Sequence, residues 1–308
     1  MTNILCINFS STMNKGRLIR GIVRYLSYAI TMIFLLPFFS LVTSEAYSQS
    51  PQIDNGLVYL SNSQSQTGSW GNTPYSISTE YFSTVEVLLS LEQLGLADTS
   101  AYRNGLIWLQ SQEVKDTAYL AKKIQILSNS GMEQTTDVSL LYSYKNFDGG
   151  WGGYLSFESS NYRTALALQA LKAANYSDQT IIQLAIDYLL STQNSDGGWG
   201  FYPSTCSGCN DGDESNVYIT AIVSLTLHQF PQTTSIATAI NKATGYLINQ
   251  QQTDGSWTTV YETALAYLAL VGETTDATVL GNAINYLTST QLPNGSWDDD
   301  PYSTALAL

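Results

Sequence analysis

The chain has 308 residues, of which 44% are hydrophobic and 12% charged, and its 25 acidic and 12 basic residues give a formal net charge of −13. This balance argues against binding to nucleic acid or to an anionic membrane surface, because both require clustered basic side chains. High aromatic content and low charge predict an ordered chain with one large domain or a small array of repeats.

Residues 1–48 are predicted to be a targeting segment. Basic residues precede a largely apolar run over 25–42, and small residues suited to cleavage follow it. This pattern is typical of a secretory signal peptide. We therefore expect a mature domain over 49–308 that is secreted, periplasmic or held at the cell surface, without inserting into the membrane. The alternative is an uncleaved N-terminal membrane anchor that leaves the same domain facing outwards.

One pattern recurs in the remaining chain with constant internal spacing: an aromatic residue and Leu, a Gln five positions after the aromatic, and then Gly-x-Trp. Four complete copies end at Trp70, Trp199, Trp257 and Trp297. A weaker copy ends at Trp151 and has Lys145 in the Gln position, and another opens at Trp108 and has Tyr119 in the Trp position. Strict spacing within copies and loose spacing between them are typical of a repeat architecture.

Each copy predicts a pair of helices. Apolar residues recur at three and four positions between Ile181 and Leu189, which predicts an amphipathic outer helix capped by Ser177 or Asp178. We expect the Gly before each Trp to end this outer helix. A second stretch, centred on Thr-Ala as at Thr164, is apolar on nearly all sides and predicts a buried inner helix. Three inner helices are predicted to stop at Gly95, Gly131 and Gly272.

Six such pairs predict an all-α protein in which six helix hairpins close into a double-layered (α/α)6 barrel, or toroid. The sixth inner helix begins near Thr304, and the sequence leaves it shorter than the other five. We expect this helix to be truncated and the barrel to be open or poorly closed beside it.

The repeated pattern resembles the QW motif of squalene and oxidosqualene cyclases. Residues 51–308 as a whole resemble the superfamily that also contains the β-subunits of protein prenyltransferases. The resemblance implies the toroid fold, and it implies that the repeated Gln and Trp tie neighbouring helix pairs together. It also implies a carboxylic acid that protonates an alkene, which the cyclases carry in the sequence Asp-x-Asp-Asp-Thr-Ala.

The nearest match to this acidic sequence is Glu113-Val-Lys-Asp-Thr-Ala, in which Lys115 replaces the proton-donating Asp. An ammonium group is no strong acid, and its charge would repel a developing carbocation. We expect Lys115 to form a salt bridge with Glu113 and Asp116 instead.

An aromatic residue stands two positions before the Thr in five inner helices, at Phe82, Tyr162, Tyr218, Tyr261 and Tyr302. If the inner helices point the same way, these residues form a belt near one mouth of the barrel. Such a belt could stabilise a carbocation, or stack on a sugar ring or a lipid chain. The alternative is that the rings only pack between adjacent helices. Asp116 and Glu262, each directly before a Thr, are the acidic residues nearest to this belt.

The longest connection contains the candidate cation and disulfide sites. Asp211 and Asp213 offer oxygen ligands for Ca²⁺, with a solvated acidic loop as the alternative. Cys206 and Cys209 are expected to form a local disulfide after export. A Zn²⁺ site made of these two cysteines, Asp211 and His228 is disfavoured, and no other cofactor is expected.

The sequence favours an exported toroid without the family's standard catalytic acid, acting as a non-catalytic binding or interaction module. Its partner would be an apolar or glycan-like small molecule, or another extracellular protein. One alternative is an active terpene cyclase, an isomerase, with Asp116, Glu113 or Glu262 as a non-standard acid. The second alternative is a carbohydrate-active α/α-barrel enzyme, which would need two carboxylates that face each other across a cleft. The use that thioester domains make of the toroid is not supported, because no Cys-Gly-Glu-Gln sequence occurs.

Overall fold

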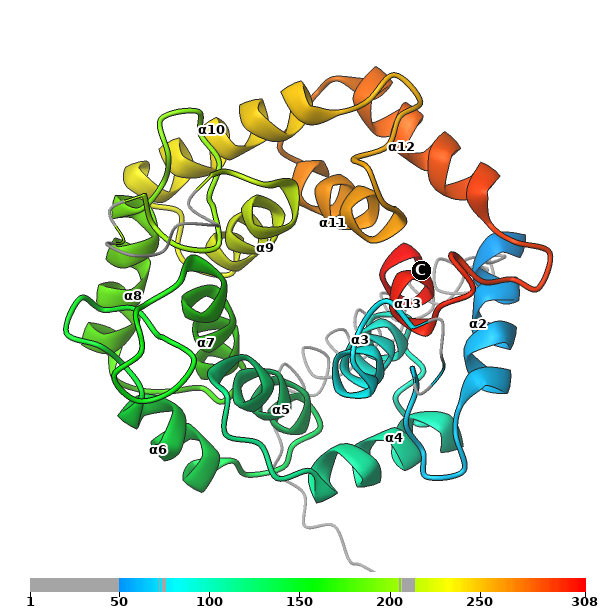
Figure 1. Ribbon diagram of the computed structural model, residues 1–308, viewed down its shortest axis with the longest axis horizontal. Coiled ribbons are helices and arrows are strands. Elements are labelled where there is room, and N and C mark those ends of the chain that lie inside the picture. Colours follow the sequence, from blue (N-terminus) through cyan, green and yellow to red (C-terminus); the bar gives the residue numbers. More distant parts are fainter. Residues whose placement is uncertain (1–49, 72, 74–75, 205, 207–213) are drawn as a thin grey trace, which may run out of the picture. The chain divides into compact units, whose positions relative to one another are not determined.

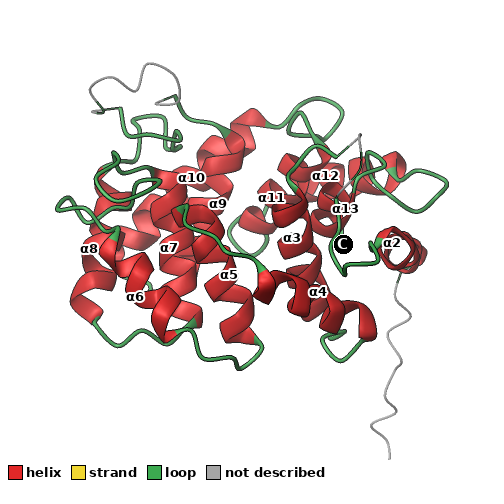
Figure 2. Cartoon of the chain, turned by 60° about the horizontal axis from the view of Figure 1, so that its bottom comes forward, coloured by secondary structure: helices red, strands yellow, loops and turns green. Residues whose placement is uncertain are grey.

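The computed structural model describes residues 50–308 except 72, 74–75, 205 and 207–213. The predicted targeting segment therefore lies outside the described residues. Within the described ranges the secondary structure consists of helices joined by loops, with isolated β-bridges and no strand (Figure 2). No helix of this part is long and apolar enough to cross a bilayer.

The helices form two concentric rings (Figure 1). The outer ring contains α2 (Pro51–Ser63), α4 (Ser100–Ser111), α6 (Thr135–Ser143), α8 (Gln179–Ser191), α10 (Thr234–Gln250) and α12 (Ala277–Thr290). The inner ring contains α3 (Glu80–Gln93), α5 (Thr117–Asn129), α7 (Asn161–Ala173), α9 (Val217–His228), α11 (Val260–Leu270) and α13 (Pro301–Ala307). Outer and inner helices alternate along the chain, so the fold is the predicted toroid of helix hairpins.

The inner ring is closed. Its helices contact one another in the order α3, α5, α7, α9, α11 and α13, and α13 returns to α3. The last inner helix has 7 residues, whereas the other five have 11 to 14. The prediction of a short sixth inner helix is therefore confirmed. The prediction that the barrel is open or poorly closed was wrong, since even this short helix packs against both α3 and α11.

The start of α8 agrees with the predicted cap, whereas the outer helices do not end where the sequence predicted. Asp178 caps α8 by accepting hydrogen bonds from the backbone N–H groups of the first turn. The outer helices, however, end before the motif glycine. In α10 the extended backbone of Gln251 ends the helix, and Gly255 shapes the turn that follows. A glycine with positive φ follows the C-cap of three inner helices as predicted, at Gly95, Gly131 and Gly272.

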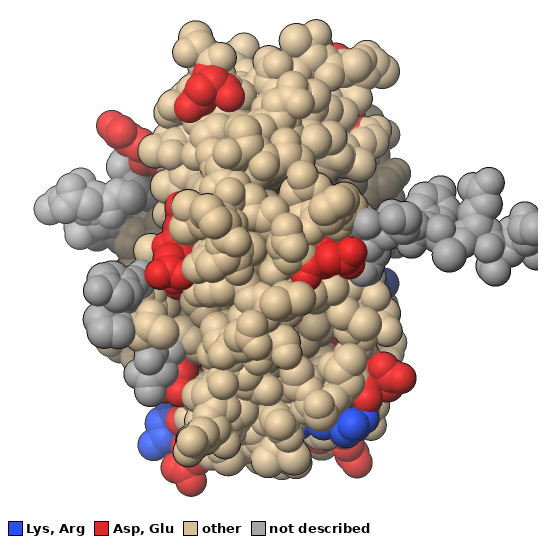
Figure 3. Space-filling model, turned by 90° about the vertical axis from the view of Figure 1, so that its right-hand side faces the viewer, with Lys and Arg blue, Asp and Glu red and all other residues tan. Residues whose placement is uncertain are grey.

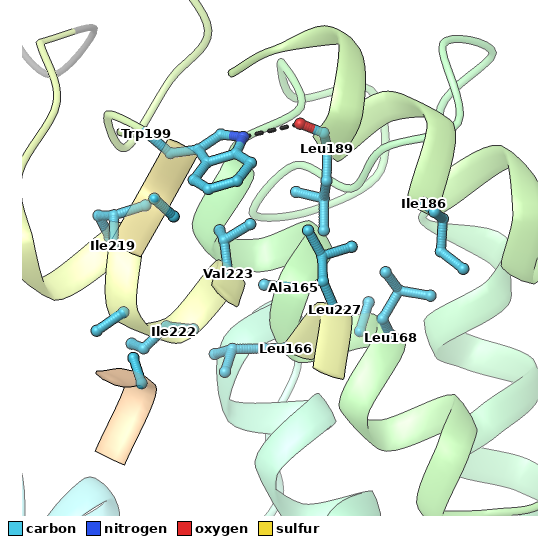
Figure 4. Packing of buried hydrophobic residues seen from close by; sticks show 14 of the residues in the cluster. Ala165, Leu166, Leu168, Ile186, Leu189, Trp199, Ile219, Ile222, Val223 and Leu227 are labelled. Atoms are coloured by element: carbon cyan, nitrogen blue, oxygen red, sulfur yellow. Dashed lines mark hydrogen bonds between the residues drawn. The ribbon is translucent and has the colours of Figure 1, made fainter. Parts of the chain in front are cut away.

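Each repeated Trp fastens an outer helix to its inner partner. The indole Nε1 of Trp199 donates to the carbonyl of Leu189 at 2.7 Å (Figure 4), and its backbone N–H donates to Oγ1 of Thr220 on α9 at 2.9 Å. The same two bonds are made by Trp70, Trp151, Trp257 and Trp297. All five indoles are at most 2% exposed. The Trp and Thr-Ala signatures of the sequence are thus hydrogen-bonded partners.

The repeated Gln links each copy to the next. Nε2 of Gln193 donates to the carbonyl of Gly197 in its own turn and to that of Ala239 in α10, both at 2.8 Å. Gln64, Gln251 and Gln291 bond in the same way. For Gln291, the acceptor outside its own turn is the carbonyl of Gln52 in α2, at 2.8 Å. This bond joins the last copy to the first and closes the outer ring.

The outer side of the toroid that carries α2 and α12 has a mostly uncharged surface (Figure 3). Acidic side chains are spread over this face, and the basic side chains drawn on it form no patch. This distribution agrees with the net charge and offers no binding surface for a polyanion on this side.

Gly245 gives a direct test of helix propensity in this fold. It lies exposed inside α10, and a Cβ added there meets no atom within 4 Å. We expect Gly245→Ala to raise the free energy of unfolding by about 0.5–1 kcal/mol, measured by urea denaturation. Gly105 in α4 is the control, because its added Cβ would lie 2.8 Å from the Trp70 ring and should destabilise the protein. No gain in the first variant would contradict the open surroundings described for Gly245.

Candidate functional site

A cavity of about 520 Å³ lies within the inner ring. Side chains of all six inner helices line it, joined by residues of α2 and α12. Its charged lining comes from α3 and α5, with Glu86 and Lys122 beside Ser90, Gln93 and Gln125, and other elements add polar residues such as Gln169 and Gln229. Its aliphatic lining comes mainly from α9, α11, α12 and α13, with Ile222, Leu225, Leu265, Leu268, Ile284 and Leu306. The cavity therefore has a charged side, at α3 and α5, and a mostly aliphatic side.

Four of the five predicted belt residues form a continuous row. The ring centroids of Tyr162, Tyr218, Tyr261 and Tyr302 follow one another at 6.0, 5.9 and 5.8 Å. Three of these residues line the central cavity, and three line a separate hollow of about 270 Å³, so the row divides the two spaces. The fifth aromatic, Phe82, packs against Tyr119 at 4.7 Å and is not part of this row.

The tyrosines that close this end of the cavity are neutral. Desolvation by burial raises the pKa of Tyr162, Tyr218 and Tyr302 well above the ordinary value, and the charge of Glu86 adds to this effect. The hydroxyl oxygens of Tyr218 and Tyr302 lie 3.0 Å apart. At neutral pH these phenols can donate and accept hydrogen bonds, but they offer neither a base nor an acid strong enough to protonate an alkene.

Sequence reasoning missed the charged pair inside the cavity. Nζ of Lys122 lies 2.9 Å from Oε1 of Glu86, and their side chains are only 10% and 11% exposed. Ser90 stands one turn after Glu86 on α3, is 6% exposed, and has an Oγ without a hydrogen-bond partner among the described residues. The sequence did contain an indication of this pair, because Glu86 and Lys122 lie within stretches predicted to be buried inner helices, and a buried charge requires a partner.

The predicted catalytic acids lie outside this cavity. Oδ1 of Asp116 caps α5 through the N–H of Ala118 at 2.8 Å, and Oδ2 lies 3.2 Å from Nη2 of Arg163 on α7. Glu262 accepts a hydrogen bond from the hydroxyl of Thr259 at the start of α11. Both carboxylates thus belong to helix N-termini, where they oppose the positive end of the helix dipole.

The salt bridge expected for Lys115 was wrongly predicted. Lys115 and Glu113 are both exposed, and Asp116 pairs with Arg163 instead. The reason is geometric: Arg163 comes from the neighbouring inner helix and reaches the capping carboxylate from the side.

An open cleft of about 600 Å³ lies at the degenerate second copy of the repeat. It is lined by Glu113, Lys115 and Asp116 and by the aromatic residues Trp108, Tyr119 and Tyr154, among others. The connection between α4 and α5 is short there and contains no Gly-x-Trp turn. We attribute the cleft to this missing turn, because a turn of that kind packs against the next outer helix in the other copies.

The remaining candidate sites are only partly described. Asp211 and Asp213, the proposed Ca²⁺ ligands, lie outside the described residues. In the part of the chain that is described, no group of three or more His, Cys, Asp or Glu is suited to hold a metal. Nε2 of His228 lies 2.9 Å from Oε1 of Glu273. Cys206 is disulfide-bonded, but Cys209 lies outside the described residues and their pairing stays a prediction.

Comparison with protein families gives one match. The model of the A-macroglobulin TED domain matches residues 114–275, just over half of the chain. None of the curated proteins matches the chain.

Solved structures share the fold at low sequence identity. The type II terpene cyclase MstE from Scytonema has a TM-score of 0.60 and 18% identity, over 80% of each chain. ent-Copalyl diphosphate synthase from Streptomyces platensis has a TM-score of 0.57 and 22% identity, over 74% of this chain and 48% of that one. A possible GH105 family member from Salmonella enterica has a TM-score of 0.57 and 13% identity, over 83% and 91%. These likenesses establish a terpene cyclase-like α/α toroid.

Proposed function

The chain belongs to the A-macroglobulin TED domain family, and we propose that it is a non-catalytic member that binds an apolar small molecule in the central cavity of the toroid. The Cys-Gly-Glu-Gln sequence of thioester domains does not occur in it, so covalent capture through such a thioester is not part of the proposal. We also propose that the domain is exported through the segment 1–48.

The observation that carries this proposal is a set of apolar side chains left accessible along the cavity. Leu268 on α11 and Ile284 on α12 are each 44% exposed, and both line the cavity. Large aliphatic side chains that remain accessible within a concave, partly enclosed site are typical of ligand-binding pockets. An apolar ligand would gain about 25 cal/mol for each Å² of apolar surface that it buries there.

Two features support binding without cyclisation. Lys115 stands where the cyclase resemblance requires a proton-donating Asp. Among the described residues that line the cavity, Glu86 is the carboxylate, and it is bound to the ammonium group of Lys122. Protonation of an alkene needs a carboxylic acid that carries its proton, and a carboxylate that pairs with an ammonium group is the opposite arrangement.

Binding can be tested by competition against Nile red, a neutral apolar dye whose fluorescence rises in apolar surroundings. We expect squalene to displace the dye from the wild-type protein. Leu268→Lys should lower the affinity for both Nile red and squalene at least about tenfold, because it places an ammonium group among the apolar side chains that line the cavity. Leu184→Lys is the matched control, since Leu184 is 40% exposed on the outer helix α8 and should leave binding unchanged. Equal binding by the two variants would exclude the cavity as the site.

A second candidate function is sugar recognition at the cleft of the second copy. This cleft is lined by the half-buried Trp108 and by Tyr154, which is 45% exposed, together with Glu113 and Gln112. Aromatic faces beside carboxylate and amide groups suit a pyranose ring, which presents both C–H and O–H groups. A glycan array should then give a signal that Trp108→Ala removes while Nile red displacement persists. An empty array with the wild-type protein removes this candidate.

A further inference from the structure

The charged pair of the central cavity has unused hydrogen-bonding capacity. In the described part of the chain, Glu86 and Lys122 are bonded only to each other. A carboxylate accepts with two oxygens and an ammonium donates with three N–H groups, so each retains capacity beyond this single contact. The Oγ of Ser90 adds a third polar group that is buried without a partner among the described residues. All three line the same cavity.

These polar groups face a cavity that is otherwise suited to an apolar molecule. Glu86 and Ser90 come from α3 and Lys122 from α5, whereas α9, α11, α12 and α13 contribute mainly aliphatic side chains. An elongated ligand can therefore place an apolar body against the aliphatic side and a polar end against the pair. An entirely apolar ligand such as squalene still gains from the aliphatic side, but it covers the pair and Ser90 without satisfying them, which lowers its affinity.

We infer that the site formed by Glu86, Lys122 and Ser90 selects apolar molecules that end in a neutral hydroxyl group. This inference rests on the proposed function. A carboxylate would bring a second anion beside Glu86, and an amine would bring a second cation beside Lys122. Either would leave one charge unpaired in a site that is about nine-tenths shielded from water. A hydroxyl donates once and accepts twice, so it satisfies the pair without changing the charge of the site.

The experiment compares decan-1-ol, decanoate and decylamine, which share one apolar chain and differ in the end group. Displacement of Nile red from the full-length protein at pH 7 gives their relative affinities. We expect decan-1-ol to bind at least about tenfold more tightly than either charged compound. Equal affinities, or a preference for a charged end group, would overturn the inference.

Two variants should reverse this selectivity in opposite directions. Glu86→Gln leaves the ammonium unpaired, so decanoate should become the tightest ligand. Lys122→Met leaves the carboxylate unpaired, so decylamine should become the tightest. Asp137→Asn is the matched control. Asp137 lies on the outer helix α6, pairs with Lys123 of α5, and is not part of the cavity lining. Its substitution should therefore leave the order of the three ligands unchanged. An unaltered order in both cavity variants contradicts the inference.

The outcomes also separate this inference from the proposed function. If neither squalene nor any decyl compound displaces Nile red, the proposed function and the inference both fail. If all three decyl compounds bind alike, the cavity is a binding site and only the assigned selectivity fails. Circular dichroism shows whether each variant is folded. Where a variant does not fold, the order measured with the wild-type protein decides the question alone.

Discussion

Trp199→Ala is expected to lower the free energy of unfolding by about 3–5 kcal/mol. The indole is fully buried between α8 and α9, in the cluster drawn in Figure 4, and its Nε1 bonds to the Leu189 carbonyl. The substitution creates a large cavity and removes the shorter of the two hydrogen bonds to the Leu189 carbonyl, which keeps only the one from Oγ1 of Thr192 at 3.2 Å. Urea denaturation followed by circular dichroism measures the loss.

Trp108→Ala is the control for this experiment. Trp108 occupies the opening position of the degenerate copy, is only partly buried, and lines an open cleft. We expect its removal to cost about 1 kcal/mol. A loss as large as that of Trp199→Ala would show that any tryptophan of this chain stabilises it equally, and that burial in the repeated turn has no special effect.

Gly255→Ala is the second substitution for which we expect a large effect, a loss of about 3 kcal/mol or more. Gly255 has φ of 92°, and an added Cβ would lie 2.4 Å from the carbonyl oxygen of Asn282 on α12. The cost therefore combines a left-handed backbone with a collision against the next outer helix. Because the collision partner is backbone, it cannot turn aside as a flexible side chain would.

Gly272→Ala separates these two contributions. Gly272 has φ of 86°, yet an added Cβ meets no atom within 4 Å. Its substitution should cost only the backbone strain, about 1–2 kcal/mol. The difference between the two variants in urea denaturation then measures the contact between one copy of the repeat and the next. Equal losses would mean that the close approach at Gly255 contributes nothing to stability.

The fold could be predicted from the sequence because its determinants are local and repeated. The spacing from the aromatic residue to the Trp places the indole against the end of its own outer helix, as the bond from Trp199 to Leu189 illustrates. The Thr of the second signature receives the backbone N–H of the same Trp. The closure of the ring was harder to predict. It depends on the contact of Gln291 with Gln52, which joins opposite ends of the domain and which no local pattern reveals.

The candidate site could be predicted only where it follows the repeat. The tyrosine row is a register effect, since equivalent positions of adjacent inner helices lie side by side. Phe82 departs from it because its neighbour α5 belongs to the degenerate copy and offers Tyr119 as a packing partner. Glu86 and Lys122 occupy cavity-facing positions of the repeat at which the other inner helices carry mostly aliphatic side chains, such as Leu166 and Leu225. The sequence therefore indicated that each charge needs a partner, but the repeat did not show which.

The central claim is that the cavity holds an apolar molecule and leaves it unchanged. Incubation with squalene in D₂O, followed by mass spectrometry of the recovered lipid, tests this claim directly. A cyclase that protonates an alkene would return an isomer that carries one deuterium from the solvent. We predict that the lipid is retained by the protein and recovered as unlabelled squalene. A deuterium-labelled cyclic product, formed by the wild-type protein and lost in Glu86→Gln or in an Asp116→Asn variant, would contradict the account.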